Sequence, residues 1–268
     1  MIVRRATLAG ALALTRAEVA DMFQYRVVLF LYSLWEVVHP IVYLAVWGAI
    51  AGDGDVGGLR LSDFAAYYLT FMLVSHVTAA IEIYTFGPMI QQGELSPHLL
   101  RPMNPVWVAA ARNISYKSVS MLLLIPVWIG LVIILRPSLT ITTGSAALFV
   151  VALVVAALLS FLVGTTFALL AFWTTRSFSF WEIWIGLTFL LGGQVAPVEL
   201  LPGFVQNLAT ALPMRYTLGF PIEVLLNRLD SGELALGFAL QFAWLFAAAL
   251  VVRAVWRAGI RQYSAVGA

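Results

Sequence analysis

An apolar segment, residues 27–51, carries a stripe of polar and aromatic side chains. Spacings of three and four residues place these side chains on one face of an α-helix. The stripe combines a carboxylate and an imidazole with aromatic rings, in the order Tyr32, Glu36, His39, Tyr43 and Trp47. Glu36 lies about nine residues, or about 13 Å, into the segment. A carboxylate at that depth in a membrane has to face protein or water, so proton transfer, ion binding or substrate contact would take place on this face.

The next apolar segment, residues 62–86, adds His76 at a similar depth and Glu82 near its end, where the carboxylate can reach the membrane interface. Three hypotheses stay open for Glu36, His39 and His76. Hydrogen bonding between packed helices is favoured, because buried polar groups in membranes commonly bind helix to helix. The others are contact with a substrate route and a proton relay or metal site. We expect no metal site, since one E-x-x-H pair is a poor match to the two pairs of di-metal bundles.

Composition sets the fold class. The chain has 268 residues, of which 62% are hydrophobic and 10% charged, with a mean hydropathy of +0.95. These values predict an all-α polytopic membrane protein. The absence of cysteine excludes disulfides, thiol nucleophiles and cysteine-ligated metals. The formal net charge of +2 and the scattered basic residues predict no nucleic-acid partner.

Missing motifs exclude two enzyme classes. The single lysine, Lys117, stands in Ile-Ser-Tyr-Lys-Ser, so the chain has no G-x-x-x-x-G-K-[ST] phosphate-binding loop. No histidine follows His98 and no G-x-S-x-G motif is present, which excludes a six-span intramembrane serine protease. We therefore expect a protein that is not an enzyme and holds no cofactor of its own.

The apolar segments predict one transmembrane domain, residues 1–268, with six transmembrane helices. An N-terminal helix within residues 1–26 has the apolar stripe of a helix lying in the membrane interface, beside the first span. The six helices are expected at residues 27–51, 62–86, 106–135, 146–173, 180–193 and 234–255. The fifth has about 14 residues, or about 21 Å, against a hydrocarbon core of about 30 Å, so it cannot cross alone.

The region after this short helix, residues 194–230, carries prolines at Pro197, Pro202 and Pro213. Irregular backbone at membrane depth must be covered by protein or wetted by a cavity, which predicts a re-entrant helical hairpin. Gly192 and Gly193 would permit the bend before it, and residues 221–230 would return along the surface. Glu199 and Arg215 are either gate or substrate contacts or ordinary external surface residues, and the second interpretation is favoured.

Basic residues predict the orientation. With the N-terminus inside, the six-helix topology leaves outside a minority of the 15 basic residues, namely Arg60, Arg136, Arg215 and Arg228. This split follows the positive-inside rule. We therefore expect both termini and residues 87–105 in the cytoplasm, and the hairpin outside.

Residues 87–105 form a polar interruption that contains its own helix stop and start signals. Gly93 can end one helix, Ser96-Pro97 can open a short helix that Pro102 must end, and Asn104-Pro105 can cap the next long helix. A jointed segment of this kind on a membrane surface is typical of a docking site. His98 and Arg101 are either topology markers or docking residues, and docking is favoured.

Two motifs, in this order, carry a family resemblance over essentially the full chain. A G-E-L-x-x-x-L-L-R-P element follows the second span, and a Gly-Gly…Pro…Leu-Pro…Leu-Pro pattern follows the fifth. With these motifs the chain resembles the permease subunits of type-2 ATP-binding-cassette (ABC) exporters, in particular the short permeases with a separate ATPase subunit. The residues of the two motifs are Gly93, Glu94, Leu95, Leu99, Leu100, Arg101 and Pro102, and Gly192, Gly193, Pro197, Leu201, Pro202, Leu212 and Pro213.

The resemblance implies a division of labour. ABC ATPase subunits would bind ATP and Mg and would receive a cytoplasmic coupling helix, to which we assign Gln91, Gly93, Glu94, Leu95, Leu99, Leu100 and Arg101. A second permease, identical or related, would complete the substrate pathway. The hairpin would form the external gate, with Gly192, Gly193, Pro197, Glu199, Pro202, Pro213 and Arg215 as candidate residues. The protein would lie among the lipids of the cytoplasmic (inner) membrane of a prokaryote.

Two alternatives stay open. A proton- or ion-coupled secondary transporter would use Glu36 and His39, and its transport would collapse with the proton gradient and ignore ATP depletion. A non-transporting membrane scaffold would produce no substrate flux under either driving force.

Overall fold

The computed structural model describes residues 8–24, 26–100 and 104–263. Within these residues the regular structure is helical, which confirms the all-α prediction. The elements are α1 (Leu8–Gln24), α2 (Arg26–Ala51), α3 (Leu61–Thr78), α4 (Glu82–Gln91), α5 (Leu95–Leu99), α6 (Pro105–Leu135), α7 (Thr143–Leu169), the 3-10 helix η1 (Leu170–Phe172), α8 (Ser177–Leu191), the 3-10 helix η2 (Val198–Leu200), α9 (Gly203–Ala211), α10 (Pro213–Thr217), α11 (Gly219–Leu225) and α12 (Ser231–Gln262).

Five helical segments among the described residues are long and apolar enough to cross a membrane. They are Leu29–Ala51, Leu61–Gln91, Pro105–Leu135, Thr143–Phe172 and Ser231–Gln262. The fifth predicted helix is the shorter apolar α8, whose 15 residues span about 22 Å. The protein is thus a multi-pass membrane protein, with α8 too short to cross a bilayer core of about 30 Å by itself.

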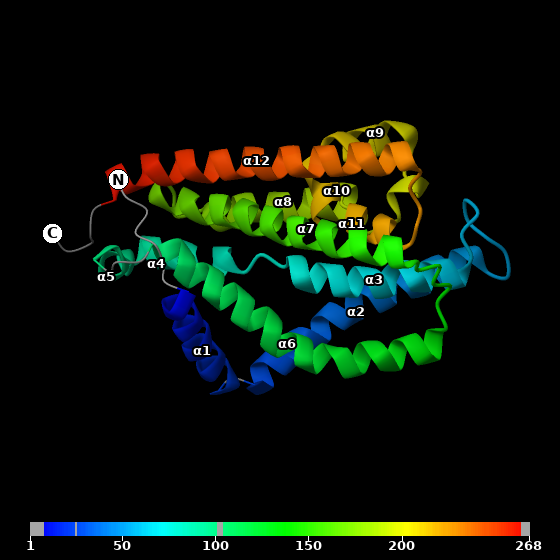
Figure 1. Ribbon diagram of the computed structural model, residues 1–268, viewed down its shortest axis with the longest axis horizontal. Coiled ribbons are helices and arrows are strands. Elements are labelled where there is room, and N and C mark those ends of the chain that lie inside the picture. Colours follow the sequence, from blue (N-terminus) through cyan, green and yellow to red (C-terminus); the bar gives the residue numbers. More distant parts are fainter. Residues whose placement is uncertain (1–7, 25, 101–103, 264–268) are drawn as a thin grey trace.

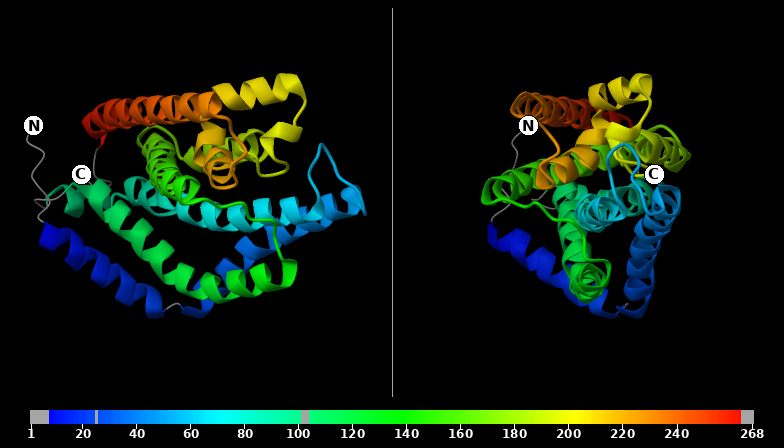
Figure 2. Two further views of the ribbon diagram at one scale, coloured as in Figure 1. Left: turned by 45° about the vertical axis from the view of Figure 1, so that its right-hand side comes forward. Right: turned by 90° about the vertical axis from the view of Figure 1, so that its right-hand side faces the viewer.

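The long helices run side by side between two ends of the molecule (Figure 1). We call the described part of residues 87–105 the elbow. The elbow end holds α4 and α5, the start of α6 and the end of α12. The hairpin end holds residues 52–60 and α9 to α11. Across the molecule, α3 lies between α2 and α6 on one side and α7 and α12 on the other (Figure 2). The elbow and the hairpin, adjacent to different spans in the sequence, therefore lie at opposite ends of one bundle.

A densely buried part of the core is where α11 packs between α3 and α7. Every residue of α11 is buried, including Phe220 and Ile222, which are fully enclosed. This corrects the expectation of a surface return for residues 221–226, whereas Asn227 and Asp230 are exposed as expected. The segment is apolar on all sides except at Glu223, and burying such a helix removes apolar area from the solvent on every face.

The N-terminal helix α1 contacts the first span, α2, as predicted, but packs mainly along α6, which was not predicted. The Ser115 hydroxyl donates to the carbonyl of Thr15 at 3.1 Å, and Arg112 pairs with Glu18 at 3.0 Å. These polar contacts tie α1 to the first half of α6.

The second span is broken, where the sequence predicted a continuous helix over residues 62–86. Helix α3 ends at Thr78 and α4 begins at Glu82, with Ala79 in an extended conformation (ψ 128°). The amide of Asn113 on α6 donates to the freed carbonyl of Ala79 at 3.3 Å. A side chain from a neighbouring helix therefore supplies the hydrogen bond that a break inside a membrane requires.

At this break α7 comes very close. A Cβ atom on Gly164 would lie 2.7 Å from the Ala80 side chain and 2.8 Å from Glu82 Oε2. We expect Gly164→Ala to destabilise the protein by about 1–3 kcal/mol, because overpacking at such a contact forces atoms apart. Thermal unfolding in detergent measures this. Gly130 on α6 has open space around its Cβ position, so Gly130→Ala is the matched control. Equal unfolding midpoints for the two variants would contradict the close packing.

Candidate functional site

The first group of predicted site residues joins three helices inside the membrane. His76 on α3 is buried, and its Nδ1 lies 2.6 Å from Oε2 of Glu36 on α2. On the other side of the ring, Nε2 lies 3.1 Å from the carbonyl oxygen of Lys117 and 3.2 Å from Oγ of Ser120, both on α6. Glu36 and His76, predicted from separate spans, are therefore brought together.

A second group lies at the break of the second span. Glu82 is fully buried, and the Asn113 amide donates to its Oε1. Its Oε2 finds no hydrogen-bond partner among the residues that the structure describes. Lys117 interacts electrostatically with both Glu82 and Glu36 and so links the two groups. We call Glu36, His76, Glu82, Asn113 and Lys117 the intramembrane cluster. The expectation that Glu82 reaches the interface was wrong, because the chain breaks just before it and turns its side chain inward.

The contribution of α6 to this cluster was not predicted. Lys117 was counted with the cytoplasmic basic residues, although this lysine stands about 12 residues inside the predicted third span. Asn113, Lys117 and Ser120 follow one another at four and three residues, the spacing of one helical face. That spacing, within a span, was the available signal.

His39 does not join the cluster. Its Nδ1 lies 3.1 Å from the carbonyl oxygen of Trp35, one turn earlier, and its ring lies beside those of Trp35 and Tyr43. The side chain of Tyr32 lies outside the described part of the structure. Glu36 and His39 therefore have separate partners, although they share a helix and an E-x-x-H spacing.

Two aromatic residues of α3 and one of the predicted stripe cover the irregular backbone after α8. The Tyr67 hydroxyl donates to the carbonyl of Gly193 at 2.6 Å. The carbonyl of Val195 accepts from the Tyr68 hydroxyl at 2.6 Å and from the Trp47 indole at 2.7 Å. Gly193 has a φ of +84°, as a bend at this position requires. The protein itself thus satisfies the backbone where the chain leaves the helix.

The prolines of the hairpin mark its turns. Pro197 and Pro202 stand just before η2 and α9, and Pro213 is the first residue of α10. Such positions need no backbone N–H inside a helix and suit the fixed φ of proline. The hairpin is therefore a series of short helices with rigid joints.

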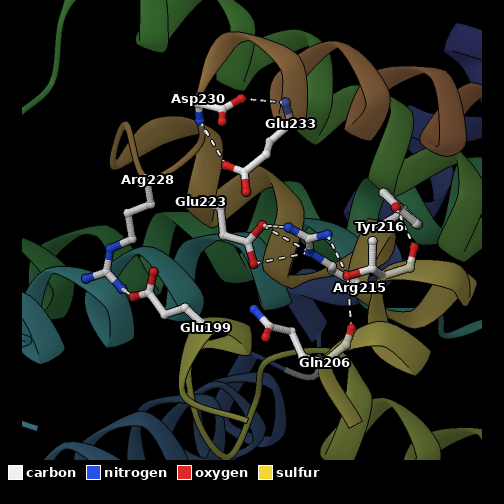
Figure 3. A network of polar contacts seen from close by, with 9 residues as sticks. Glu199, Gln206, Arg215, Tyr216, Glu223, Arg228, Asp230 and Glu233 are labelled. Atoms are coloured by element: carbon white, nitrogen blue, oxygen red, sulfur yellow. Dashed lines mark hydrogen bonds and ion pairs between the residues drawn. The ribbon is translucent and has the colours of Figure 1, made fainter. Parts of the chain in front are cut away.

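Arg215 and Glu223 form a buried ion pair inside the hairpin region (Figure 3). Arg215 Nη2 lies 2.6 Å from Glu223 Oε2, and Arg215 Nη1 donates to the Thr210 hydroxyl at 3.3 Å. The side chains are 13% and 8% exposed. Interpreting Arg215 as an ordinary surface residue was therefore wrong, since it pairs with a carboxylate in the core.

Burial raises the pKa of the Glu223 carboxyl above its ordinary value, while the charge and hydrogen bonds of Arg215 oppose this rise. The ion pair thus favours the charged form of this poorly solvated carboxylate and opposes the effect of burial. Removing the arginine would leave a buried carboxyl group that gains stability by taking up a proton.

A second ion pair closes the outer side of the hairpin (Figure 3). Arg228 Nη1 lies 2.6 Å from Glu199 Oε1, and Arg228 Nη2 donates to the carbonyl of Asp63 at 3.3 Å. The guanidinium also lies 5.6 Å from the centre of the Tyr67 ring. Because the Glu199 side chain is 39% exposed, this pair lies at the surface and joins η2 to the start of α3.

The elbow contains the predicted short helix as α5. Gly93 has a φ of +77°, and the side chain of Asn104 caps α6 by accepting from the Val106 amide at 2.9 Å. Helix α5 begins at Leu95, so Ser96 lies inside it and does not cap it. The hydroxyl of Ser96 lies 3.1 Å from that of Tyr263. The helix was predicted correctly, but its first residue was not.

The candidate docking residues of the elbow divide by exposure. Leu95 is fully buried and fixes α5 to the bundle. Side chains that face outward are Gln91, Glu94, Leu99 and Leu100. Leu100 is 89% exposed. Arg101 lies outside the described residues. Beside the elbow, residues 171–175 and 262–263 enclose an open depression of about 300 Å³.

Comparisons with known proteins give one family. A family model described as ABC-2 family transporter protein matches residues 27–267. A search of curated proteins finds no match.

The buried ion pair leads to a stability prediction. We expect Arg215→Met to lower the free energy of unfolding by about 3 kcal/mol, because it leaves a buried carboxylate without a cation. The double variant Arg215→Met/Glu223→Met should recover most of this loss. Arg176→Met, at an exposed arginine, serves as the control. Thermal unfolding in detergent measures all three, and a double variant no more stable than Arg215→Met would contradict the proposed cost of the unpaired charge.

The same variant leads to a pH prediction. In Arg215→Met, burial holds the pKa of Glu223 in the folded state above its value in the unfolded chain. Its contribution to stability is fully present below the unfolded pKa and is lost as the pH rises through the folded pKa. We therefore expect the unfolding midpoint of Arg215→Met, measured relative to the parent protein, to be higher at pH 5 than at pH 8. A difference independent of pH would contradict this.

Proposed function

Because the chain belongs to the ABC-2 transporter family, we propose that it is the transmembrane permease subunit of an ATP-driven exporter. Membership makes it a membrane transport component that is not itself catalytic. Permeases of this family typically pair with ATPase subunits. In our proposal separate ATPase subunits bind ATP and Mg, and a second permease, identical or related, completes the substrate pathway.

The observation that carries the proposal is the exposed face of the elbow. Helix α5 is held from inside by the buried Leu95, yet Leu99 at its end and Leu100 directly after it face outward, 38% and 89% exposed. The carboxylate of Glu94 stands beside them and is exposed as well. Apolar side chains fixed on a rigid support and bordered by charge are typical of a site where another protein binds.

The arrangement of the bundle supports a gate at the other end. The hairpin lies opposite the elbow (Figure 1), where α9 to α11 cover the ends of the long helices. In our proposal the elbow end faces the cytoplasm and the hairpin end faces outward, in the inner membrane of a prokaryote with both termini cytoplasmic. The basic residues of the sequence support this orientation through the positive-inside rule.

The alternative of a proton- or ion-coupled carrier receives less support from the geometry. It would use Glu36 and His39, but these residues bind different partners, His76 and the Trp35 carbonyl. The intramembrane cluster links α2, α3 and α6 through hydrogen bonds and charge. Its role in our proposal is to hold these helices together.

The test is whether an ATPase docks on the elbow. An ATPase subunit should co-purify with the chain, and ATP hydrolysis by the complex should drive export from lipid vesicles. Glu94→Ala combined with Arg101→Ala should reduce transport by about tenfold or more, while hydrolysis continues. The control is Asp53→Ala combined with Arg60→Ala, the same charge change at the hairpin end. Transport that survives in the elbow variant would contradict the assigned docking site.

A further inference from the structure

The last helix connects the two ends of the molecule without interruption. Helix α12 has 32 residues, or about 48 Å of length. Figure 1 shows it running from the hairpin end, beside α9, to the elbow end. It therefore has the length and position to carry a displacement from one end to the other.

At the elbow end, α12 is joined directly to the docking segment. Tyr263 follows the last residue of α12, and its hydroxyl donates to the carbonyl of Gly93 at 2.8 Å. The same hydroxyl lies 3.1 Å from that of Ser96 on α5. One side chain thus ties the end of α12 to both the bend and the short helix of the elbow.

Aromatic rings reinforce this connection. Trp256 on α12 stacks on Phe86 of α4 with the ring centres 6.1 Å apart and lies 6.1 Å from Phe172. The ring of Phe172 also meets Tyr263 edge-on at 5.9 Å. Gly259 packs so closely on Phe172 that a side chain there would overlap the ring. We call Phe86, Phe172, Trp256, Gly259 and Tyr263 the elbow joint.

A comparable joint lies at the other end. Gln241 on α12 is fully buried, and its amide donates to the carbonyls of Tyr216 and Ala152, both at 3.0 Å. The indole of Trp244 donates to the carbonyl of Ala211 at 3.2 Å. Ala211 ends α9 and Tyr216 lies in α10, so both bonds hold backbone of the hairpin. Gly237 packs against the ring of Phe220 on α11 in the same way that Gly259 packs against Phe172.

The span that leads into the elbow along the chain is a poorer route. The break between Thr78 and Glu82 separates α4 from α3, so a push on α4 can be absorbed at the joint between them. A continuous helix moves as one rigid body, so that a tilt at one end displaces the other, and packed interfaces pass from one arrangement to another as units. The unbroken α12, which is hydrogen-bonded to both the elbow and the hairpin, offers a direct mechanical connection.

We propose that α12 is the strut that transmits movement of the elbow to the external hairpin, and that Tyr263 is the positioning residue that couples the elbow to it. This inference rests on the proposed function, in which an ATPase moves the elbow. In this proposal the last span carries the movement. The hydrogen bonds of Gln241 and Trp244 then pass it to the hairpin.

The experiment uses hydrogen–deuterium exchange of the permease–ATPase complex in lipid vesicles, with and without trapping by ATP and vanadate. Trapping should change the exchange rate of amides in residues 203–217 by several-fold in the parent protein. In Tyr263→Ala this change should fall to less than about a third, while ATP hydrolysis continues within about twofold. Tyr263→Phe, which keeps the ring but loses the hydroxyl, should give an intermediate change.

The matched control is Tyr84→Phe. Tyr84 is 56% exposed on α4 and packs against Phe178, so its hydroxyl has no part in the elbow joint. This variant should keep the full response. A full response in Tyr263→Ala would overturn the strut, because residues 203–217 would then receive the movement without the contact to Gly93.

Failure of the proposed function would look different. If no ATPase co-purifies, or trapping changes nothing in the parent protein, the exporter proposal falls. The proposal that α12 is a strut is then tested by hydrogen–deuterium exchange of the permease alone, without nucleotide. There Tyr263→Ala should speed exchange in residues 203–217 by about threefold over Tyr84→Phe, since the hairpin is held by a helix that has lost its far support. Equal rates would overturn it.

Discussion

The structure depends on one constraint, that a polar backbone group inside a membrane must find its partner within the protein. The chain leaves helical geometry after α8, and the carbonyls of Gly193 and Val195, which no longer bond within a helix, accept hydrogen bonds there from Tyr67, Tyr68 and Trp47. These donors come from α2 and α3, so the first two spans have to pack where the hairpin enters. The break in the second span follows the same rule, with Asn113 of α6 bonded to Ala79. Each departure from helix thus fixes the position of another helix.

Buried charged residues also lie beside the points where the chain leaves helical geometry. The break that frees the Ala79 carbonyl also turns Glu82 inward, where Asn113 and Lys117 face it. In the hairpin, the turn after α10 brings Arg215 onto Glu223. A buried carboxylate is costly unless a cation or hydrogen-bond donors accompany it. The buried carboxylates Glu82 and Glu223 therefore lie beside irregular joints of the bundle, where neighbouring segments supply their partners.

Much of the architecture could be predicted from the sequence because it depends on local chemistry. The length of α8 follows from an apolar run, the bend at Gly93 from a residue tolerant of positive φ, and the start of α6 from Asn104 and Pro105. The break after Thr78 could not be predicted, since residues 78–82 contain neither glycine nor proline. The burial of α11 and the partners of Lys117 depend on tertiary packing that no local pattern specifies. Glu36 and His76 were singled out correctly as polar residues at similar depth, but their contact depends on how α2 and α3 cross.

The two glycines of α12 restrict how this helix can move. Gly237 and Gly259 are about six turns apart at 3.6 residues per turn, and each accommodates an aromatic ring, from Phe220 and from Phe172. Rotation of α12 about its own axis would drive a Cβ-bearing neighbour into both rings at once, and sliding along the axis would do the same. Tilting as a single rigid body leaves both rings seated. The close contacts at Gly237 and Gly259 therefore leave α12 one main movement, which is tilting. In a tilt, a displacement of the helix end at one membrane surface produces a displacement of the other end at the opposite surface.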